Sequence, residues 1–208
     1  MAERDEIIKQ IISREWDMFS NVKSITGGKV SCQEDPRTFE IMRASNFMSY
    51  DLDVLESYLQ DLDAAIKNGR NIVAEKYGWM MKSTMPDEFC KIEHMLPSPG
   101  QDQVELIDKI VQIELEWHKD LLEKYPYLIK RGRPLYSNED SPSVTSVETY
   151  LRGELLTYSM TTLEKYYNNR LAQKKDNING IKNIMLYMVQ QYGYKSLEEA
   201  NEKLRAAG

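Results

Sequence analysis

Glu15 is an acidic residue in the middle of an apolar helical face, and it constrains the fold and function of this chain more than any other feature. The apolar residues that share its face are Ile7, Ile8, Ile11, Ile12, Met18, Phe19 and Val22. Their spacing predicts a helix from about residue 3 to about residue 22. Because burying a lone carboxylate is costly, Glu15 has to be paired, protonated or bound to another group. The sequence therefore predicts a polar site inside a helical protein.

Helical spacing of apolar residues continues along nearly the whole chain, and no segment shows convincing strand alternation. Several residues are of the types that cap, open or break helices: Asp35-Pro36, Asp51, Asn68-Gly69, Pro86, Pro126, a Thr145–Glu148 capping box and a Ser196–Glu199 box. Long helices are expected over about 102–125, from the Thr145–Glu148 box onward and over about 178–192. The expected fold is all-α, a single-domain bundle over residues 1–208 with about five longer helices and short accessory ones.

Composition narrows the possible partners and location of the protein. A chain of 208 residues can bury one core, and its formal charge of -6 argues against a nucleic-acid partner. The single basic cluster, Lys130–Arg133, opens the most loop-like segment, residues 130–143, which is a lid or a linker. Cys32 and Cys90 have neither metal-ligand nor disulfide spacing, and neither a secretory signal nor a membrane-spanning stretch is evident. We expect a cytoplasmic protein that binds neither nucleic acid nor a membrane.

Ionisable residues recur on the apolar faces of five predicted helices. They are Glu15, Arg43, Lys76, the pair Glu114 and His118 one turn apart, and Glu154. Each of them alone is most simply explained as a residue at the edge of the apolar face, with its stem packed and its charged end in water. Because they recur, we expect the three glutamates to be neutralised by Arg43, Lys76 and a protonated His118 in one network. That network is either a ligand site or a buried ion-pair cluster that binds nothing, and the sequence leaves both open.

The segment from Gly27 to Asp35 joins two of these helices. Paired glycines allow backbone amides to approach a ligand, and the helix start at Pro36 can face an anion. Cys32 lies just before that start, where a thiol pKa is lowered, so it is a candidate nucleophile or ligand contact. Equally, Gly27-Gly28 is a simple turn and Cys32 a small buried side chain.

Six segments resemble a bacterial family catalogued only as a domain of unknown function. They are Glu15-Trp-Asp-Met-Phe19, Gly27-Gly28, Ser31-Cys-Gln33, Phe39-Glu-Ile-Met-Arg43, Glu75-Lys-Tyr77 and Tyr150-Leu-Arg-Gly-Glu-Leu-Leu-Thr-Tyr-Ser159. The resemblance covers nearly the whole chain and implies a bacterial origin and a complete chain. It implies no activity.

The mixed charges favour a small-molecule enzyme that uses acid–base chemistry in a closed helical pocket. The expected catalytic residues are Glu15, Cys32, Glu114, His118 and Glu154, and the expected substrate-binding residues are Arg43, Lys76 and Tyr158. In this scheme Glu15 or Glu154 is the base and His118, oriented by Glu114, the acid or proton shuttle. The two cations hold a carboxylate or phosphate of a small polar molecule, of which an amino-acid-like substrate is one example.

Two other function classes stay open. The three glutamates and His118 are possible ligands of a single metal ion, although Glu114 and His118 are one position too far apart for the Glu-x-x-His pair of a ferritin-like site. Alternatively, the chain is a non-catalytic binding or interaction module whose 13 tyrosines and 11 methionines line a groove. The sequence identifies no cofactor and no oligomeric state.

Overall fold

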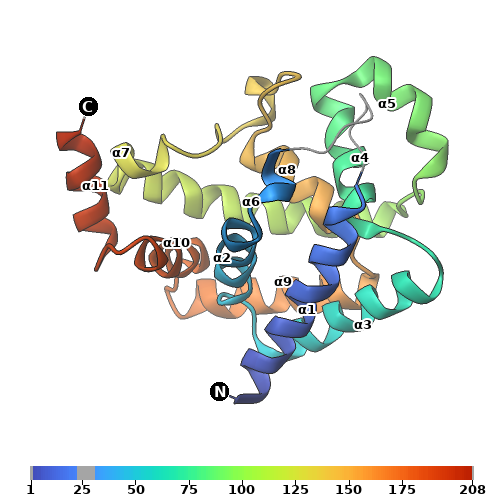
Figure 1. Ribbon diagram of the computed structural model, residues 1–208, viewed down its shortest axis with the longest axis horizontal. Helices are drawn as coiled ribbons and strands as arrows, with labels where there is room; N and C mark the ends of the chain where they lie inside the picture. Colours follow the sequence, from blue (N-terminus) through green and yellow to red (C-terminus); the bar gives the residue numbers. More distant parts are fainter. Residues whose placement is uncertain (1, 23–30, 208) are drawn as a thin grey trace.

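The computed structural model describes residues 2–22 and 31–207, and the side chains from residue 3 to 22 and from 33 to 207. Within these ranges the chain forms an all-α bundle of eleven α-helices and three short 3-10 helices (Figure 1). The β-type pairing in the described ranges is a single isolated bridge between Ser141 and Val144. None of the described helices combines the length and apolarity needed to cross a membrane. The expected fold class is therefore confirmed.

The α-helices are α1 Ala2–Ser20, α2 Pro36–Phe47, α3 Leu52–Lys67, α4 Ile72–Thr84, α5 Pro86–Ile92, α6 Gln101–Lys124, α7 Pro126–Ile129, α8 Val147–Leu155, α9 Met160–Lys175, α10 Gly180–Gln191 and α11 Leu197–Ala206. The 3-10 helices are η1 Ser31–Glu34, η2 Glu93–Met95 and η3 Ser137–Glu139. Several predicted helix starts are confirmed by their caps: Asp35 accepts a hydrogen bond from Thr38 N, and Asp51 accepts one from Val54 N.

The long helix expected from residue 145 is wrong in two respects. It is two helices, α8 and α9, because the chain turns after Leu155 and Ser159 caps a new helix. The capping box is also wrong, since Ser146, not Thr145, caps α8. Glu148 accepts hydrogen bonds from Ser137 N and Arg152 Nε and so takes no part in such a box.

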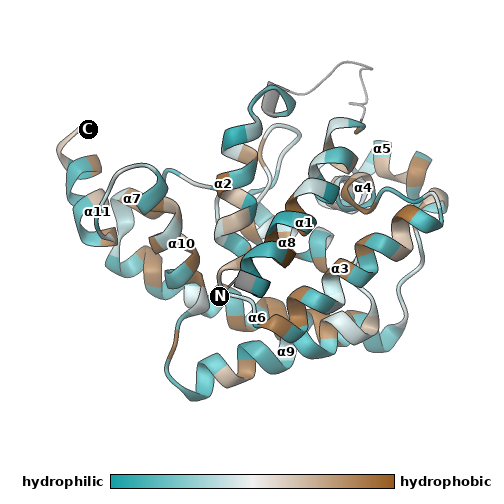
Figure 2. Cartoon of the chain, turned by 60° about the horizontal axis from the view of Figure 1, so that its bottom comes forward, coloured by the Kyte–Doolittle hydropathy of each residue, from teal (hydrophilic) through white to brown (hydrophobic). Residues whose placement is uncertain are grey.

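The main core lies among α1, α3, α6, α8 and α9, where the helices bury amphipathic faces against one another. Figure 2 shows hydrophobic and hydrophilic residues interspersed along these helices, as that packing requires. A second apolar cluster, around Trp117, Leu121 and Ile181, holds α7, α10 and α11 at one end of the molecule. Helices α4 and α5 lie at the opposite end (Figure 1) and share a smaller cluster around Trp79 and Phe89.

Helices α4 and α8 pack closely at Gly153. A Cβ atom at this position would lie 2.9 Å from the carbonyl oxygen of Lys76 and 2.9 Å from Cγ of Met80. A side chain at residue 153 would therefore push the two helices apart. The close approach positions Lys76 of α4 beside Glu154 of α8, which is the first step in building the site.

Candidate functional site

Four charged side chains from four helices meet in the interior. Glu15 comes from α1, Arg43 from α2, Lys76 from α4 and Glu154 from α8, and these four are called the buried charge cluster below. Their exposed fractions are 2%, 5%, 7% and 6%, respectively. The apolar faces on which they lie predicted that these four charges converge, and the structure brings them together.

Arg43 is at the centre of the buried charge cluster. Its Nε and Nη2 donate hydrogen bonds to Glu15 at 2.7 and 2.6 Å, and its Nη1 and Nη2 donate to Glu154 at 3.2 and 2.8 Å. Its guanidinium carbon also lies 4.8 Å from the centre of the Phe47 ring. Because these contacts use four of its five N–H groups, Arg43 is fixed by the two carboxylates and has little capacity left for a substrate.

Lys76 and two tyrosines complete the contacts of the carboxylates. Lys76 Nζ donates to Glu154 Oε2 at 2.8 Å and lies 3.7 Å from the centre of the Tyr150 ring. Tyr58 donates to Glu15 Oε1 at 2.7 Å, and Tyr158 donates to Glu154 Oε1 at 3.1 Å. Two acids thus face two bases, so the cluster carries no net charge.

Pairing holds Glu154 and Lys76 in their charged states. Burial alone would raise the pKa of Glu154, but Arg43 and Lys76 outweigh burial and lower that pKa well below its usual range. Burial opposes the charge of Lys76 as well, yet Glu154 raises the pKa of Lys76 above its usual value. Burial and the adjacent Glu15 raise the pKa of Tyr58 well above its usual value, so this hydroxyl stays protonated.

The buried charge cluster lines a cavity of about 390 Å³, called the central cavity below. Its other polar lining residues are Asp35, Thr38, Tyr58, Tyr77, Arg133, Tyr150 and Thr157, and its apolar ones are Phe19, Phe39, Met42, Ile72 and Val73. The Phe19 and Phe39 rings stack at 5.1 Å between centres and 14° between planes. The central cavity therefore combines an aromatic and aliphatic lining with a charged one.

Glu114 and His118 do not join the buried charge cluster, so the expectation of one shared network is wrong. Arg170 Nε donates to Glu114 at 2.7 Å, and Tyr166 donates to Glu114 at 2.5 Å. Arg170 is fully buried and also donates to Asn169, Gln173 and both oxygens of Ser49. Glu114 thus belongs to a second buried ion-pair group, whose contacts fully account for its inward position.

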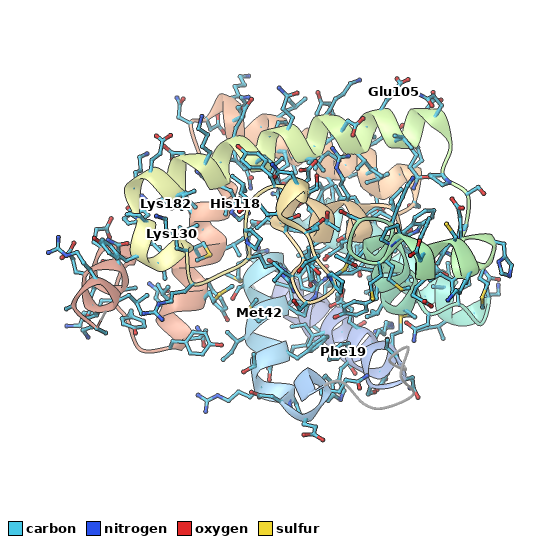
Figure 3. All side chains as sticks on the ribbon, turned by 90° about the horizontal axis from the view of Figure 1, so that it is seen from above. Phe19, Met42, Glu105, His118, Lys130 and Lys182 are labelled. Carbon is cyan, nitrogen blue, oxygen red and sulfur yellow. The ribbon has the colours of Figure 1, made fainter. Side chains whose placement is uncertain are left out.

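His118 lines a second cavity, of about 560 Å³, formed by α6, α7 and the segment before α8. Figure 3 labels His118 on α6 and, away from it, Phe19 and Met42 of the central cavity. Burial lowers the pKa of His118 more than Glu114 raises it, so a protonated imidazole is not the partner of the glutamates. The second cavity and the central cavity share one lining residue, Arg133.

Two other expectations concern Cys32 and metal binding. The side chain of Cys32 and the pair Gly27-Gly28 lie outside the described residues. Among the residues that the structure does describe, no three His, Cys, Asp or Glu side chains are grouped to hold a metal ion. The proposed ligand set of three glutamates and His118 is therefore wrong, because these residues are divided between separate groups.

Four further residues at these two groups and the central cavity were not predicted from the sequence: Arg170, Tyr58, Tyr150 and Arg133. Leu163, Tyr166 and Arg170 are spaced for one helix face, so Arg170 was detectable once α9 was separated from α8. Tyr58 has the spacing of an apolar core residue, and this spacing does not indicate that its hydroxyl donates to Glu15. Arg133 lies between helices, where no periodic pattern indicates which side chains face a cavity.

Fold and site together define an all-α protein with a self-neutralised buried charge cluster beside a cavity. The chain belongs to the family described as protein of unknown function (DUF4125), whose model matches residues 5–202. No curated protein and no solved structure matched the chain. The resemblance to an uncharacterised family is confirmed, and function has to be argued from the site itself.

Proposed function

We propose that this protein binds a small polar molecule in the central cavity. The observation that carries the proposal is the meeting of four buried charges beside a cavity of about 390 Å³. Ligand sites usually have volumes of roughly 300–1,000 Å³ and are mostly apolar, with a few convergent polar groups. The central cavity has this composition.

A purely structural role explains the buried charge cluster less well. Buried ion pairs are a poor source of net stability, because the cost of removing both charges from water offsets their attraction. The Glu114–Arg170 group fits such a role, since neither of its charged residues lines either cavity. All four charges of the buried charge cluster, in contrast, line the central cavity.

The geometry supports binding of a small polar molecule. It does not support the acid–base catalysis that was expected from the sequence. A general base or acid works best with a pKa near the operating pH. The low pKa of Glu154 and the high pKa of Lys76 keep both groups ionised throughout the neutral range. They therefore act as fixed charges that orient a ligand.

We assign this binding to the cytoplasm, since two cysteines without disulfide spacing suit a reducing compartment.

A screen with a cavity-filling variant tests the proposal. Amino acids, hydroxy acids, aromatic acids, nucleosides and sugar phosphates would be screened by ligand-observed NMR against the wild type and against Met42→Trp. Met42 lines the central cavity and is 42% exposed, so a larger side chain can occupy the cavity without disturbing the core. Met95→Trp is the matched control, because Met95 is 71% exposed and lines neither cavity.

We expect at least one compound to bind the wild type and Met95→Trp with a Kd below about 1 mM. Met42→Trp should weaken that binding at least tenfold while its circular dichroism spectrum stays that of the wild type. The proposal is wrong if no compound binds, or if Met42→Trp binds every ligand as tightly as Met95→Trp does.

A further inference from the structure

Arg133 is an exposed residue that lines both cavities. Its guanidinium carbon lies 4.7 Å from the centre of the Tyr150 ring, and its Nη1 donates to the carbonyl oxygen of Thr145 at 3.1 Å. That single hydrogen bond leaves most of its N–H groups available. Arg133 is thus held in place at the central cavity while keeping its capacity to bind a ligand.

The charges around the central cavity are balanced except at Arg133. Arg43 is paired with Glu15 and Glu154, and Lys76 with Glu154. No carboxylate in the described part of the chain forms an ion pair with Arg133.

The third acid of the lining, Asp35, is already engaged. Its carboxylate accepts hydrogen bonds from Thr38 N at 2.9 Å and from Thr38 Oγ1 at 2.7 Å. It also caps α2, and the positive end of a helix dipole stabilises a carboxylate there. The positive charge of Arg133 is therefore the one in the lining that has no compensating partner.

Tyr150 adds a second polar group to the same region. Its ring contacts both Lys76 Nζ, at 3.7 Å, and the Arg133 guanidinium, at 4.7 Å. Its hydroxyl has no hydrogen-bond partner among the described residues, and the side chain is only half-buried. An anion beside this ring would meet Arg133 and the Tyr150 hydroxyl at once, with Lys76 adding positive potential.

We propose that the ligand of the central cavity is an organic anion whose carboxylate or phosphate group is bound by Arg133 and Tyr150. This inference rests on the proposed function and adds the ligand class. The guanidinium of arginine suits the proposal, because its planar N–H groups match two oxygens of a carboxylate or phosphate. The aromatic and aliphatic lining, with the stacked Phe19 and Phe39 rings, accepts an apolar or aromatic body.

Four compounds test the ligand class: benzoate, phenyl phosphate, inorganic phosphate and the uncharged benzamide. Binding would be measured by isothermal titration calorimetry. We expect benzoate or phenyl phosphate to bind at least tenfold more tightly than benzamide, and the preferred one of the two identifies the anionic group. Inorganic phosphate should bind more weakly than phenyl phosphate, because it lacks the apolar body.

Variants then assign the anion to its partners. Arg133→Gln should weaken binding of the preferred anion by about 10- to 100-fold, the loss typical of removing a charged hydrogen-bond donor, and should leave benzamide unaffected. Arg131→Gln is the matched control, since Arg131 is also exposed but lines neither cavity. Tyr150→Phe should weaken anion binding several-fold.

Four results would overturn the inference. Benzamide binding as tightly as the anions, or unchanged anion affinity in Arg133→Gln, contradicts the ligand class. If His118→Gln loses anion binding and Tyr150→Phe keeps it, the anion binds in the second cavity. A failure of all four compounds to bind also rejects the inference, whereas the proposed function is judged separately by the Met42→Trp screen.

Discussion

The hydroxyl oxygens of Tyr50 and Tyr158 lie 3.3 Å apart, and this contact joins the two buried ion-pair groups. Tyr158 donates its proton to Glu154, so Tyr50 is the donor to Tyr158. The Tyr50 ring packs 4.8 Å from the Tyr166 ring and 5.3 Å from the Arg170 guanidinium. Burial, with a smaller effect of Glu154, raises the pKa of Tyr50 to about 12. Two uncharged tyrosines therefore lie between the charged groups. Hydrogen bonds link Tyr50 through Tyr158 to Glu154, and ring contacts link Tyr50 to Tyr166 and Arg170.

Arg43→Met should destabilise the protein by about 3–5 kcal/mol, because it leaves Glu15 buried without its cation and Glu154 with one instead of two. Urea unfolding monitored by circular dichroism measures the effect. The double variant Arg43→Met/Glu15→Leu retains the Lys76–Glu154 pair and restores the charge balance, so it should be more stable than Arg43→Met. An equal or greater loss in the double variant would show that charge balance is not what the cluster requires.

Glu154→Gln should make the free energy of unfolding less dependent on pH below about pH 5. Arg43 and Lys76 depress the pKa of Glu154 below its ordinary value of 4.5, outweighing the opposing effect of burial. The carboxylate therefore contributes stability above about pH 4.5, and this contribution is lost as the pH falls toward the depressed value. Unfolding free energies at about pH 7, 5, 4 and 3 should show the wild type converging on Glu154→Gln in acid.

The control for this pH dependence is Glu116→Gln, whose carboxylate and Lys174 partner are each 51% exposed. This variant should differ from the wild type by less than about 1 kcal/mol at neutral pH. A wild-type profile that runs parallel to that of Glu154→Gln from about pH 7 to pH 3 would contradict the assigned pKa direction.

Gly153→Ala should cost about 1–3 kcal/mol, because its methyl group would meet the Lys76 carbonyl oxygen and Met80 at 2.9 Å each. Moving α4 away from α8 should also lengthen the Lys76–Glu154 contact. Melting temperature and a crystal structure of the variant measure these two effects. Gly100→Ala is the control, since an added Cβ there has no neighbour within 4 Å. Gly100 is the N-cap of α6, where alanine is less favourable than glycine, so this variant should lower the melting temperature less than Gly153→Ala and leave the Lys76–Glu154 contact unchanged.

Arg170→Lys should destabilise the fold by about 3 kcal/mol or more while leaving ligand affinity in the central cavity unchanged. Lysine cannot reproduce the simultaneous contacts of Arg170 with Glu114, Tyr166 and Ser49. Chemical unfolding measures the first effect, and titration with the ligand found in the screen, at a temperature where the variant is folded, measures the second. A large loss of affinity in folded Arg170→Lys would mean that the two ion-pair groups are functionally coupled through the Tyr50–Tyr158 contact.

Local patterns predicted much of the fold. Asp35-Pro36 and Asp51 mark helix starts because capping depends on residues within one turn, and both were confirmed. The break between α8 and α9 was missed, because Thr157 and Tyr158 sit at positions that a continuous helix also permits. Thr145 and Ser146 are both possible caps of α8, and local sequence does not distinguish them. Glu148 is engaged by Ser137 N, a contact from another segment, so it does not form a capping box with Thr145.

The candidate site was predictable only where a charge interrupts an apolar face. Glu15, Arg43, Lys76 and Glu154 met this condition, and periodicity identified their inward direction. Periodicity does not say which inward charges meet, so Glu114 and His118 were joined to the wrong group. Pairing depends on helix positions in space, such as the close approach of α4 and α8 at Gly153.

The neutrality of the buried charge cluster determines which lining residues can be replaced one at a time. Glu15, Arg43, Lys76 and Glu154 satisfy one another, so replacing any one of them alone endangers folding. Arg133 and Met42 are exposed, and replacing them leaves the ion pairs among those four residues intact. Substitutions at the solvent-facing edge can therefore change the lining of the central cavity, whereas the four interior charges have to be changed together.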